Sequence, residues 1–166
     1  MADLVSYLVF DVEAVADGSL IAQAKFGDEE LSPGEAIAKF GAERFEQYGS
    51  NVLPPTWMLP ISVAVAKVDS GFRLIGLEVL DAPAYRPHVI TDLFWKGWKH
   101  YGQPTLVTFN GRGYDLPVLE LAAYRYGITL PEWFNVQARS YEPVSYTHLR
   151  AHETRHDVVC RLLLEK

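Results

Sequence analysis

An apolar run near the N-terminus ends in two acidic residues, and this combination limits what the chain can form. Residues 4–12, LVSYLVFDV, have the composition of a buried β-strand. Side chains two residues apart on a strand point the same way, so Asp11 and Glu13 are predicted to share one face. Two neighbouring anions repel each other unless a cation lies between them. The pattern therefore predicts the beginning of a metal site.

Local signals predict a helical insertion and a hairpin after this strand. Residues 16–58 break the strand pattern, and Ser32-Pro33-Gly34-Glu35 has the form of a capping box with proline at the first helical position. An apolar stripe of helical spacing follows it as far as Gly49: Ile37, Phe40, Phe45 and Tyr48. Two β-rich runs, 61–68 and 72–80, surround a short glycine-bearing turn and predict a hairpin.

The second half of the chain predicts a helix, a strand and another helix. Residues 90–102 form an amphipathic pattern, 105–111 a short buried strand, and 115–127 a helix with proline in its first turn and glycine past its end. The full order is strand, helical insertion, hairpin, helix, strand and helix, which is typical of a mixed α/β domain.

Composition excludes several classes of protein. The chain has 166 residues, enough for one domain, and no apolar run long enough to span a bilayer. The apolar N-terminus lacks the basic region of a signal peptide, and a single cysteine fits a reducing compartment, so we expect a cytoplasmic protein without a membrane partner. A net charge of −6 argues against a large basic surface for nucleic acid, but it is compatible with a small acidic site that reaches nucleic acid through metal ions.

A second acidic motif follows the later strand. In residues 106–121, LVTFNGRGYDLPVLEL, a strand ends, two glycines permit an unusual turn, and Asp115 opens a helix. Taken alone, Asp115 is most simply a helix N-cap. Asp11 and Glu13, taken alone, are most simply exposed residues at the end of the first strand. Taken together, carboxylates at the ends of two strands of an α/β sheet predict an oxygen-ligand site for divalent cations.

These two motifs carry a family resemblance. Residues 10–13, FDVE, resemble the first motif of the DEDD 3′–5′ exonucleases, and residues 109–115, FNGRGYD, resemble the second motif in the spacing of family B DNA polymerase proofreading domains. Over residues 5–142 the chain is similar to bacterial stand-alone proteins described as predicted 3′–5′ exonucleases related to that domain. The resemblance implies an RNase H-like α/β fold, a mixed sheet flanked by helices.

The resemblance also implies a mechanism and its residues. Asp11 and Glu13 would hold two Mg²⁺ or Mn²⁺ ions, and Asp115 would complete the shell. Asn110 would orient the second motif or touch nucleic acid, although a turn-stabilising side chain is the simpler interpretation. The implied reaction is hydrolysis of the terminal phosphodiester at the 3′ end of a single-stranded nucleic acid, with DNA favoured over RNA. The sequence points to no particular protein partner.

The chain departs from the family after Asp115. The family has a fourth acid in a motif Tyr-x-x-x-Asp on a later helix, but the only later aspartate is Asp157, and Glu153 stands four residues before it. We therefore expect a C-terminally incomplete fold with weak metal binding and little nuclease activity. Residues 144–166 resemble the in-frame translation of a sequencing adaptor. We interpret 1–142 as a partial exonuclease domain and 143–166 as a non-native tail.

Three further interpretations are compatible with the sequence. The tail places His148, His152 and His156 at helical spacing, which would suggest a Zn²⁺ site if the tail were native. A non-catalytic nucleic-acid-binding module on the same fold would explain the missing fourth acid. A metal-dependent phosphoesterase of small nucleotides would also use the first two motifs.

Overall fold

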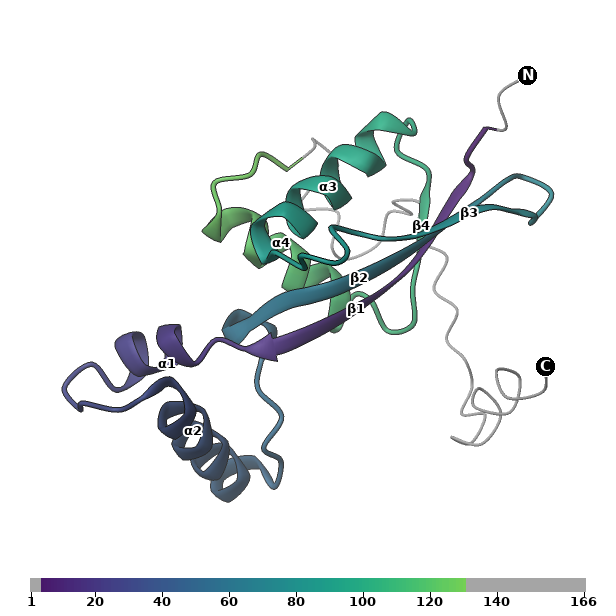
Figure 1. The fold of residues 1–166 in the computed structure, drawn as a ribbon. Helices are drawn as coiled ribbons and strands as arrows, with labels where there is room; N and C mark the ends of the chain where they lie inside the picture. Colours follow the sequence, from purple (N-terminus) through teal and green to yellow (C-terminus); the bar gives the residue numbers. More distant parts are fainter. Residues whose placement is uncertain (1–3, 131–166) are drawn as a thin grey trace.

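The computed structural model describes residues 4–130, and within them the predicted order of elements is confirmed (Figure 1). The tail and its histidine row lie outside the described residues. The elements are β1 (Tyr7–Ala16), α1 (Gly18–Lys25), α2 (Pro33–Tyr48), the 3₁₀ turn η1 (Pro55–Trp57), β2 (Met58–Val68), β3 (Leu74–Val79), α3 (Pro87–His100), β4 (Thr105–Val107) and α4 (Asp115–Arg125).

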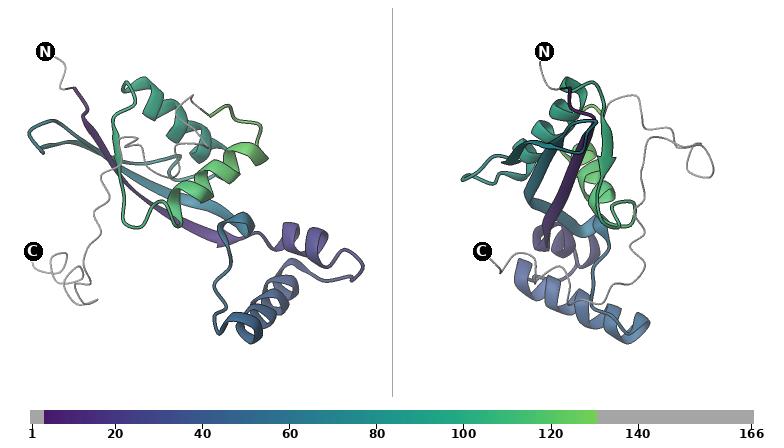
Figure 2. Two further views of the ribbon diagram at one scale, coloured as in Figure 1. Left: turned by 180° about the vertical axis from the view of Figure 1, so that it is seen from behind. Right: turned by 90° about the vertical axis from the view of Figure 1, so that its right-hand side faces the viewer.

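The sheet has four strands in the order β3-β2-β1-β4. β1 and β2 pair in antiparallel fashion, as do β2 and β3, whereas β4 runs parallel to β1 and pairs Thr105 with Tyr7 and Val107 with Val9. Helices α3 and α4 lie side by side on one face, as two views show (Figures 1 and 2). This mixed sheet with helices is compatible with an RNase H-like exonuclease fold.

β1 is buried on one face only, which corrects the expectation of a fully buried strand. Leu8, Phe10 and Val12 point into the core under α3 and α4, whereas Val9 is 39% exposed on the opposite face. β1 also extends to Ala16, beyond its two acids, because its pairing with β2 continues after a bulge at Glu13. Burial of alternate residues therefore leaves the acids on the open face.

The core joins the sheet to α3 and α4. Trp95, 1% exposed, donates its indole N–H to the carbonyl of Leu119 at 3.3 Å, and Trp98 donates to the carbonyl of Pro104 at 2.8 Å. Because a buried indole needs an acceptor, these bonds fix how α3 meets α4 and the start of β4. No helix among residues 4–130 has the length and apolar character required to cross a bilayer.

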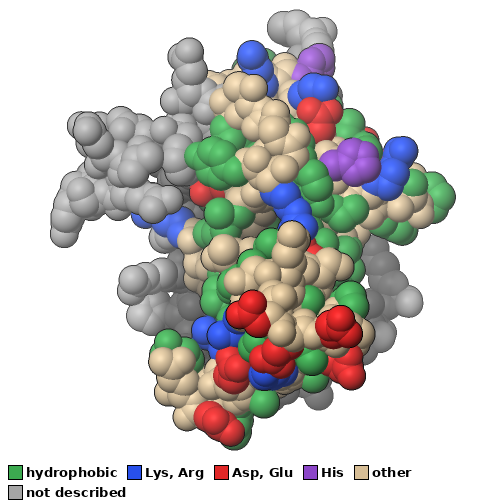
Figure 3. Space-filling model, turned by 90° about the vertical axis from the view of Figure 1, so that its left-hand side faces the viewer, with side chains coloured by type: hydrophobic (Ala, Val, Ile, Leu, Met, Phe, Trp, Pro, Cys, Tyr) green, Lys and Arg blue, Asp and Glu red, His purple; other side chains and the backbone are tan. Residues whose placement is uncertain are grey.

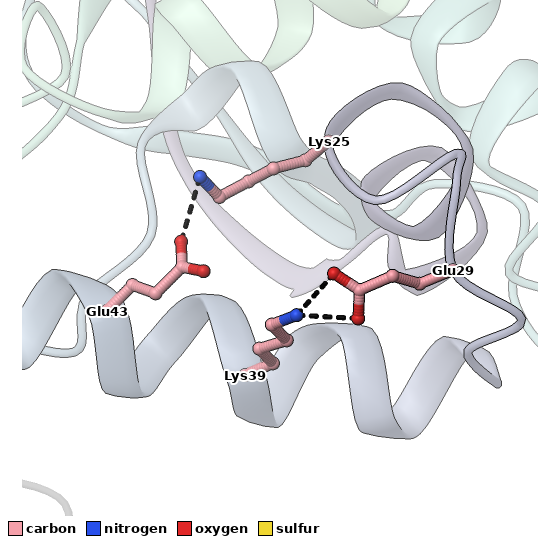
Figure 4. A network of polar contacts seen from close by, with 4 residues as sticks. All are labelled: Lys25, Glu29, Lys39 and Glu43. Atoms are coloured by element: carbon pink, nitrogen blue, oxygen red, sulfur yellow. Dashed lines mark hydrogen bonds and ion pairs between the residues drawn. The ribbon is translucent and has the colours of Figure 1, made fainter.

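Helices α1 and α2 of the 16–58 insertion form a separate small core. Ile21, Phe26, Ala36, Phe40 and Leu53 are buried together. Across these helices, Lys25 pairs with Glu43 at 2.9 Å and Lys39 with Glu29 at 2.5 Å (Figure 4).

The insertion differs from the sequence prediction on one side of α2. The predicted capping box and the left-handed Gly49 at φ 69° are both confirmed. Phe45 and Tyr48, however, are 61% exposed, so only Phe40 of the predicted stripe is buried. Acidic side chains gather over the lower part of the face drawn in Figure 3, where α1 and α2 lie. Residues 16–58 hold seven acidic and three basic residues, which disfavours contact between this insertion and phosphates.

Candidate active site

The alternation of β1 places two candidate acids on one face. Asp11 and Glu13 are exposed, and the residues on either side of Asp11 are buried, so the predicted shared face is confirmed. Their partners across the pairing with β2 are Ala64 and Ser62, whose small side chains leave the carboxylates open to solvent. The bulge directly after Glu13 bends the strand at this point, a common device beside functional sites.

Asp115 reaches the same region from α4 and is buried, with 4% exposure. The helix N-cap is Tyr114, so the interpretation of Asp115 as an N-cap is wrong. Its carboxylate instead accepts a hydrogen bond from the hydroxyl of Thr108, with 2.6 Å between Oγ1 and Oδ2. The Asp115 carboxylate also accepts a hydrogen bond from its own backbone N–H, at the first residue of α4, so it contacts both the loop and the start of the helix.

The short length of β4 explains how Asp115 meets β1. Pairing between these strands ends at Val107 opposite Val9, which is shorter than the predicted strand 105–111. Farther along β1, the backbone N–H of Val12 donates a hydrogen bond to the Asp115 carboxylate. Asp115 thus takes a place beside β1 that a longer β4 would occupy, next to the strand that carries Asp11 and Glu13.

Electrostatic effects connect these side chains. Burial raises the pKa of Asp115, and the negative charge of Asp11 raises it further, while the hydrogen bonds from Thr108 and Val12 lower it. The pKa of Tyr114 is raised by burial and then by the charges of Asp115 and Glu13. Asp11 is therefore close enough to α4 to raise the pKa of Asp115, and Glu13 is close enough to raise the pKa of Tyr114.

The three carboxylates do not converge into one cluster. Within residues 4–130, no three Asp, Glu, His or Cys side chains are arranged to hold a metal ion. What the structure brings together is an exposed pair, Asp11 and Glu13, and a buried Asp115 that is hydrogen-bonded to Thr108 and Val12. The candidate site therefore consists of two solvent-exposed carboxylates on β1 and one buried, hydrogen-bonded carboxylate at the start of α4.

Asn110 lies in the turn that connects β4 to α4. It has a left-handed backbone at φ 52°, and its carbonyl accepts a hydrogen bond from the N–H of Gly113 at 2.8 Å. A Cβ on Gly113 would lie 2.9 Å from Oδ1 of Asn110, so the glycine makes room for the amide. This geometry favours the turn-stabilising interpretation of Asn110, and its contact with nucleic acid stays a prediction.

Sequence reasoning missed Thr108 and the backbone of Val12. A threonine at the end of a β-rich run has the signature of an ordinary strand residue, since threonine favours strands. Its bond to a residue seven positions later depends on the loop between them, and neither helical nor strand periodicity encodes that approach. No pattern in side chains could reveal the Val12 N–H, because it becomes available only where β4 stops.

The fold and the acids at neighbouring strand ends define an α/β domain compatible with the RNase H-like exonucleases. The family described as predicted 3′–5′ exonuclease related to the exonuclease domain of PolB matches residues 50–162, more than half of the chain. The chain belongs to this family. The matched stretch contains Asn110 and Asp115 and begins after Asp11 and Glu13. No curated protein and no solved structure matches the chain significantly.

Proposed function

We propose that this chain carries a 3′–5′ exonuclease site that hydrolyses terminal phosphodiesters of single-stranded nucleic acid, DNA in preference to RNA. Family membership supports the class of reaction. The observation that carries the assignment of the site is the exposed pair Asp11 and Glu13 on β1, beside the point where Asp115 accepts a hydrogen bond from the same strand. Residues 1–142 contain no cysteine and so need no oxidising compartment for disulfide formation, and we propose a cytoplasmic setting.

The donor chemistry of the pair fits Mg²⁺ or Mn²⁺. Both ions prefer carboxylate oxygens, and Mg²⁺ keeps several of its waters, so two exposed carboxylates suffice as a first anchor. When bound, two such ions would supply hydroxide and stabilise the departing 3′ oxygen. In this proposal Asp11 and Glu13 bind the ions, Asp115 completes the acidic set, and Asn110 meets the nucleic acid.

The same proposal predicts weak activity for this chain. No Tyr-x-x-x-Asp motif follows Asp115, so the fourth acid and the tyrosine that helps to position water are missing. Two-metal catalysis depends on the fixed placement of both ions, and an incomplete acidic set loosens it. We expect Mn²⁺ binding that can be measured and trimming of DNA that is far slower than in a homologue with all four acids.

Two measurements on the full chain test the proposal. The first is Mn²⁺ binding, followed by the electron paramagnetic resonance signal of free Mn²⁺, in the wild type and in Asp11→Asn and Glu13→Gln. The second is shortening of a 5′-labelled single-stranded DNA, with and without EDTA. Asp92→Asn is the matched control, because Asp92 is an acid of α3 that pairs with Lys96 at 2.7 Å.

The expected result is Mn²⁺ binding that Asp11→Asn and Glu13→Gln abolish and Asp92→Asn preserves, together with slow trimming from the 3′ end that EDTA stops. Absence of Mn²⁺ binding in the wild type would refute the metal site. Trimming as fast as in a complete homologue would refute the predicted impairment. Hydrolysis of mononucleotides with no effect of DNA length would identify a small-nucleotide phosphoesterase instead.

A second candidate is a non-catalytic nucleic-acid-binding module. It is favoured by the hydrogen bonds that occupy Asp115 and by the lack of a three-residue metal cluster within residues 4–130. Binding of labelled DNA in EDTA separates the candidates. A metal-bridged site loses affinity under chelation, whereas a binding module keeps it.

A further inference from the structure

Thr108 occupies the junction between β4 and the loop that leads to α4. It follows the last residue of β4 and is half-buried, and its Oγ1 donates to Oδ2 of Asp115 at 2.6 Å. A hydrogen bond from a hydroxyl to a carboxylate is charge-assisted and short, and this distance is within that class. The hydroxyl therefore holds one oxygen of a carboxylate that is almost wholly buried.

The loop is built closely around the Thr108 side chain. A Cβ on Gly111 would lie 1.8 Å from Cγ2 of Thr108 and 3.2 Å from its Oγ1. Gly111 does not have a positive φ, so the backbone conformation does not require glycine here. What requires glycine is space for the threonine. The loop in turn is joined to α4, since the N–H of Leu116 donates to the carbonyl of Gly111 at 2.9 Å.

Asp115 is fixed from a second direction by β1. The backbone N–H of Val12 donates to the same carboxylate, and Val12 lies between Asp11 and Glu13 in the sequence. One donor comes from the strand that holds the two exposed acids, and the other comes from the end of β4. The carboxylate is therefore hydrogen-bonded from two different elements, in addition to the backbone N–H of Asp115 itself.

We propose that Thr108 is a positioning residue, whose hydroxyl holds the Asp115 carboxylate beside β1, and that Asp115 held there strengthens the divalent-cation binding that the exposed pair Asp11 and Glu13 carries. Gly111 is needed to admit Thr108. The inference rests on the proposed function. Hydrogen-bond partners of metal-binding carboxylates typically change metal affinity by about 10–100-fold when they are removed. Thr108 acts through Asp115 and makes no contact with the cation.

A purely structural threonine behaves differently, and the chain offers one for comparison. Thr91 in α3 is 0% exposed, and its Oγ1 donates to the carbonyl of Pro87 at 2.7 Å. Its hydrogen bond has a similar length but a backbone acceptor within its own helix. Loss of this hydroxyl should lower the stability of the protein and leave cation binding unchanged.

The test measures Mn²⁺ affinity and urea unfolding in EDTA for the full chain and its variants. Thr108→Val removes the hydroxyl and keeps the shape of the side chain, Thr108→Ser restores the hydroxyl, and Thr91→Val is the control. We expect Thr108→Val to bind Mn²⁺ about 10–100-fold more weakly, Thr108→Ser to remain within about threefold of the wild type, and Thr91→Val to be unchanged. Gly111→Ala should weaken binding as Thr108→Val does.

The outcomes separate this inference from the proposed function. If the wild type binds Mn²⁺ and Thr108→Val binds equally well, the positioning role is refuted and the proposed site stands. If the wild type does not bind Mn²⁺, the proposed site fails and the inference fails with it. Should Thr108→Val not fold, the comparison passes to Thr108→Ala and Thr108→Ser, which differ only in the hydroxyl. Equal affinities in that pair also refute the inference.

Discussion

An ion pair between Asp17 and Arg125 joins the start of the insertion to the end of α4. Asp17 is 5% exposed, and its Oδ1 caps α1 by accepting a hydrogen bond from the N–H of Leu20 at 3.0 Å. Its Oδ2 is completely buried, accepts no hydrogen bond of ordinary geometry, and contacts Nη1 of Arg125. The guanidinium is therefore the sole compensation for a buried carboxylate oxygen among the described residues.

The two halves of this pair should respond unequally to substitution. Arg125→Met leaves the carboxylate of Asp17 buried and unpaired, which we expect to cost roughly 3 kcal/mol of unfolding free energy. This value is the low end of the range for a broken buried pair, because the Arg125 side chain is 37% exposed. Asp17→Asn keeps a good capping residue and frees a guanidinium that water can solvate, so it should cost about 1 kcal/mol.

Urea unfolding at pH 7, followed by tryptophan fluorescence, measures both free energies. The double variant Asp17→Asn/Arg125→Met should cost far less than the sum of the two single variants, because the charge stranded by Arg125→Met is absent. A coupling free energy of about 2 kcal/mol is expected on this basis. If Arg125→Met costs no more than Asp17→Asn, or if the two costs add, then Asp17 does not depend on Arg125 and the reasoning is refuted.

Two further predictions concern a loop and a turn. Gly111→Ala should destabilise the protein by about 1–3 kcal/mol, because the added Cβ would lie 1.8 Å from Cγ2 of Thr108. Gly97→Ala in α3, where nothing lies within 4 Å of the added Cβ, should instead stabilise the protein by about 0.5–1 kcal/mol. Equal changes in the free energy of urea unfolding would contradict the close approach of Gly111 to Thr108. The Arg86 side chain, by hydrogen bonding, holds the pKa of Asp81 at about 2. A carboxylate whose pKa is lowered in the folded state stabilises the protein at pH values above its unfolded pKa of about 4, and this stabilisation is lost as the pH falls toward the folded pKa. The difference in unfolding free energy between the wild type and Asp81→Asn should therefore shrink as the pH falls from 5 to 2. A difference that stays constant over this range would contradict the prediction.

Elements with strong local signals could be predicted from the sequence. The capping box at Ser32 and Glu35 is present, with the N–H of Ser32 donating to Glu35 at 2.9 Å. Gly102 and Gly127 lie just past helix ends in left-handed conformations, as expected of helix terminators. Such signals involve residues a few positions apart, so their physics is complete within one stretch of sequence.

Features that depend on distant contacts could not be predicted in this way. Periodicity placed Phe45 and Tyr48 on one stripe of α2, but it could not show that α1 packs beside Phe40 and leaves those two exposed. For the site, the shared face of Asp11 and Glu13 follows from the alternation of a strand. The burial of Asp115 does not, because it depends on where β4 ends and on Thr108.

The parallel pairing of β1 with β4 also has a consequence for the order of folding. Tyr7 pairs with Thr105, so most of the described chain separates these two contacting residues in sequence. The hairpin of β2 and β3 closes a short loop and should form early, whereas pairing over such a separation carries a larger entropy cost and should form late. Because Asp115 lies beyond β4 in the sequence, its contact with β1 should form late as well, and the acidic site should be among the last features of the fold to assemble.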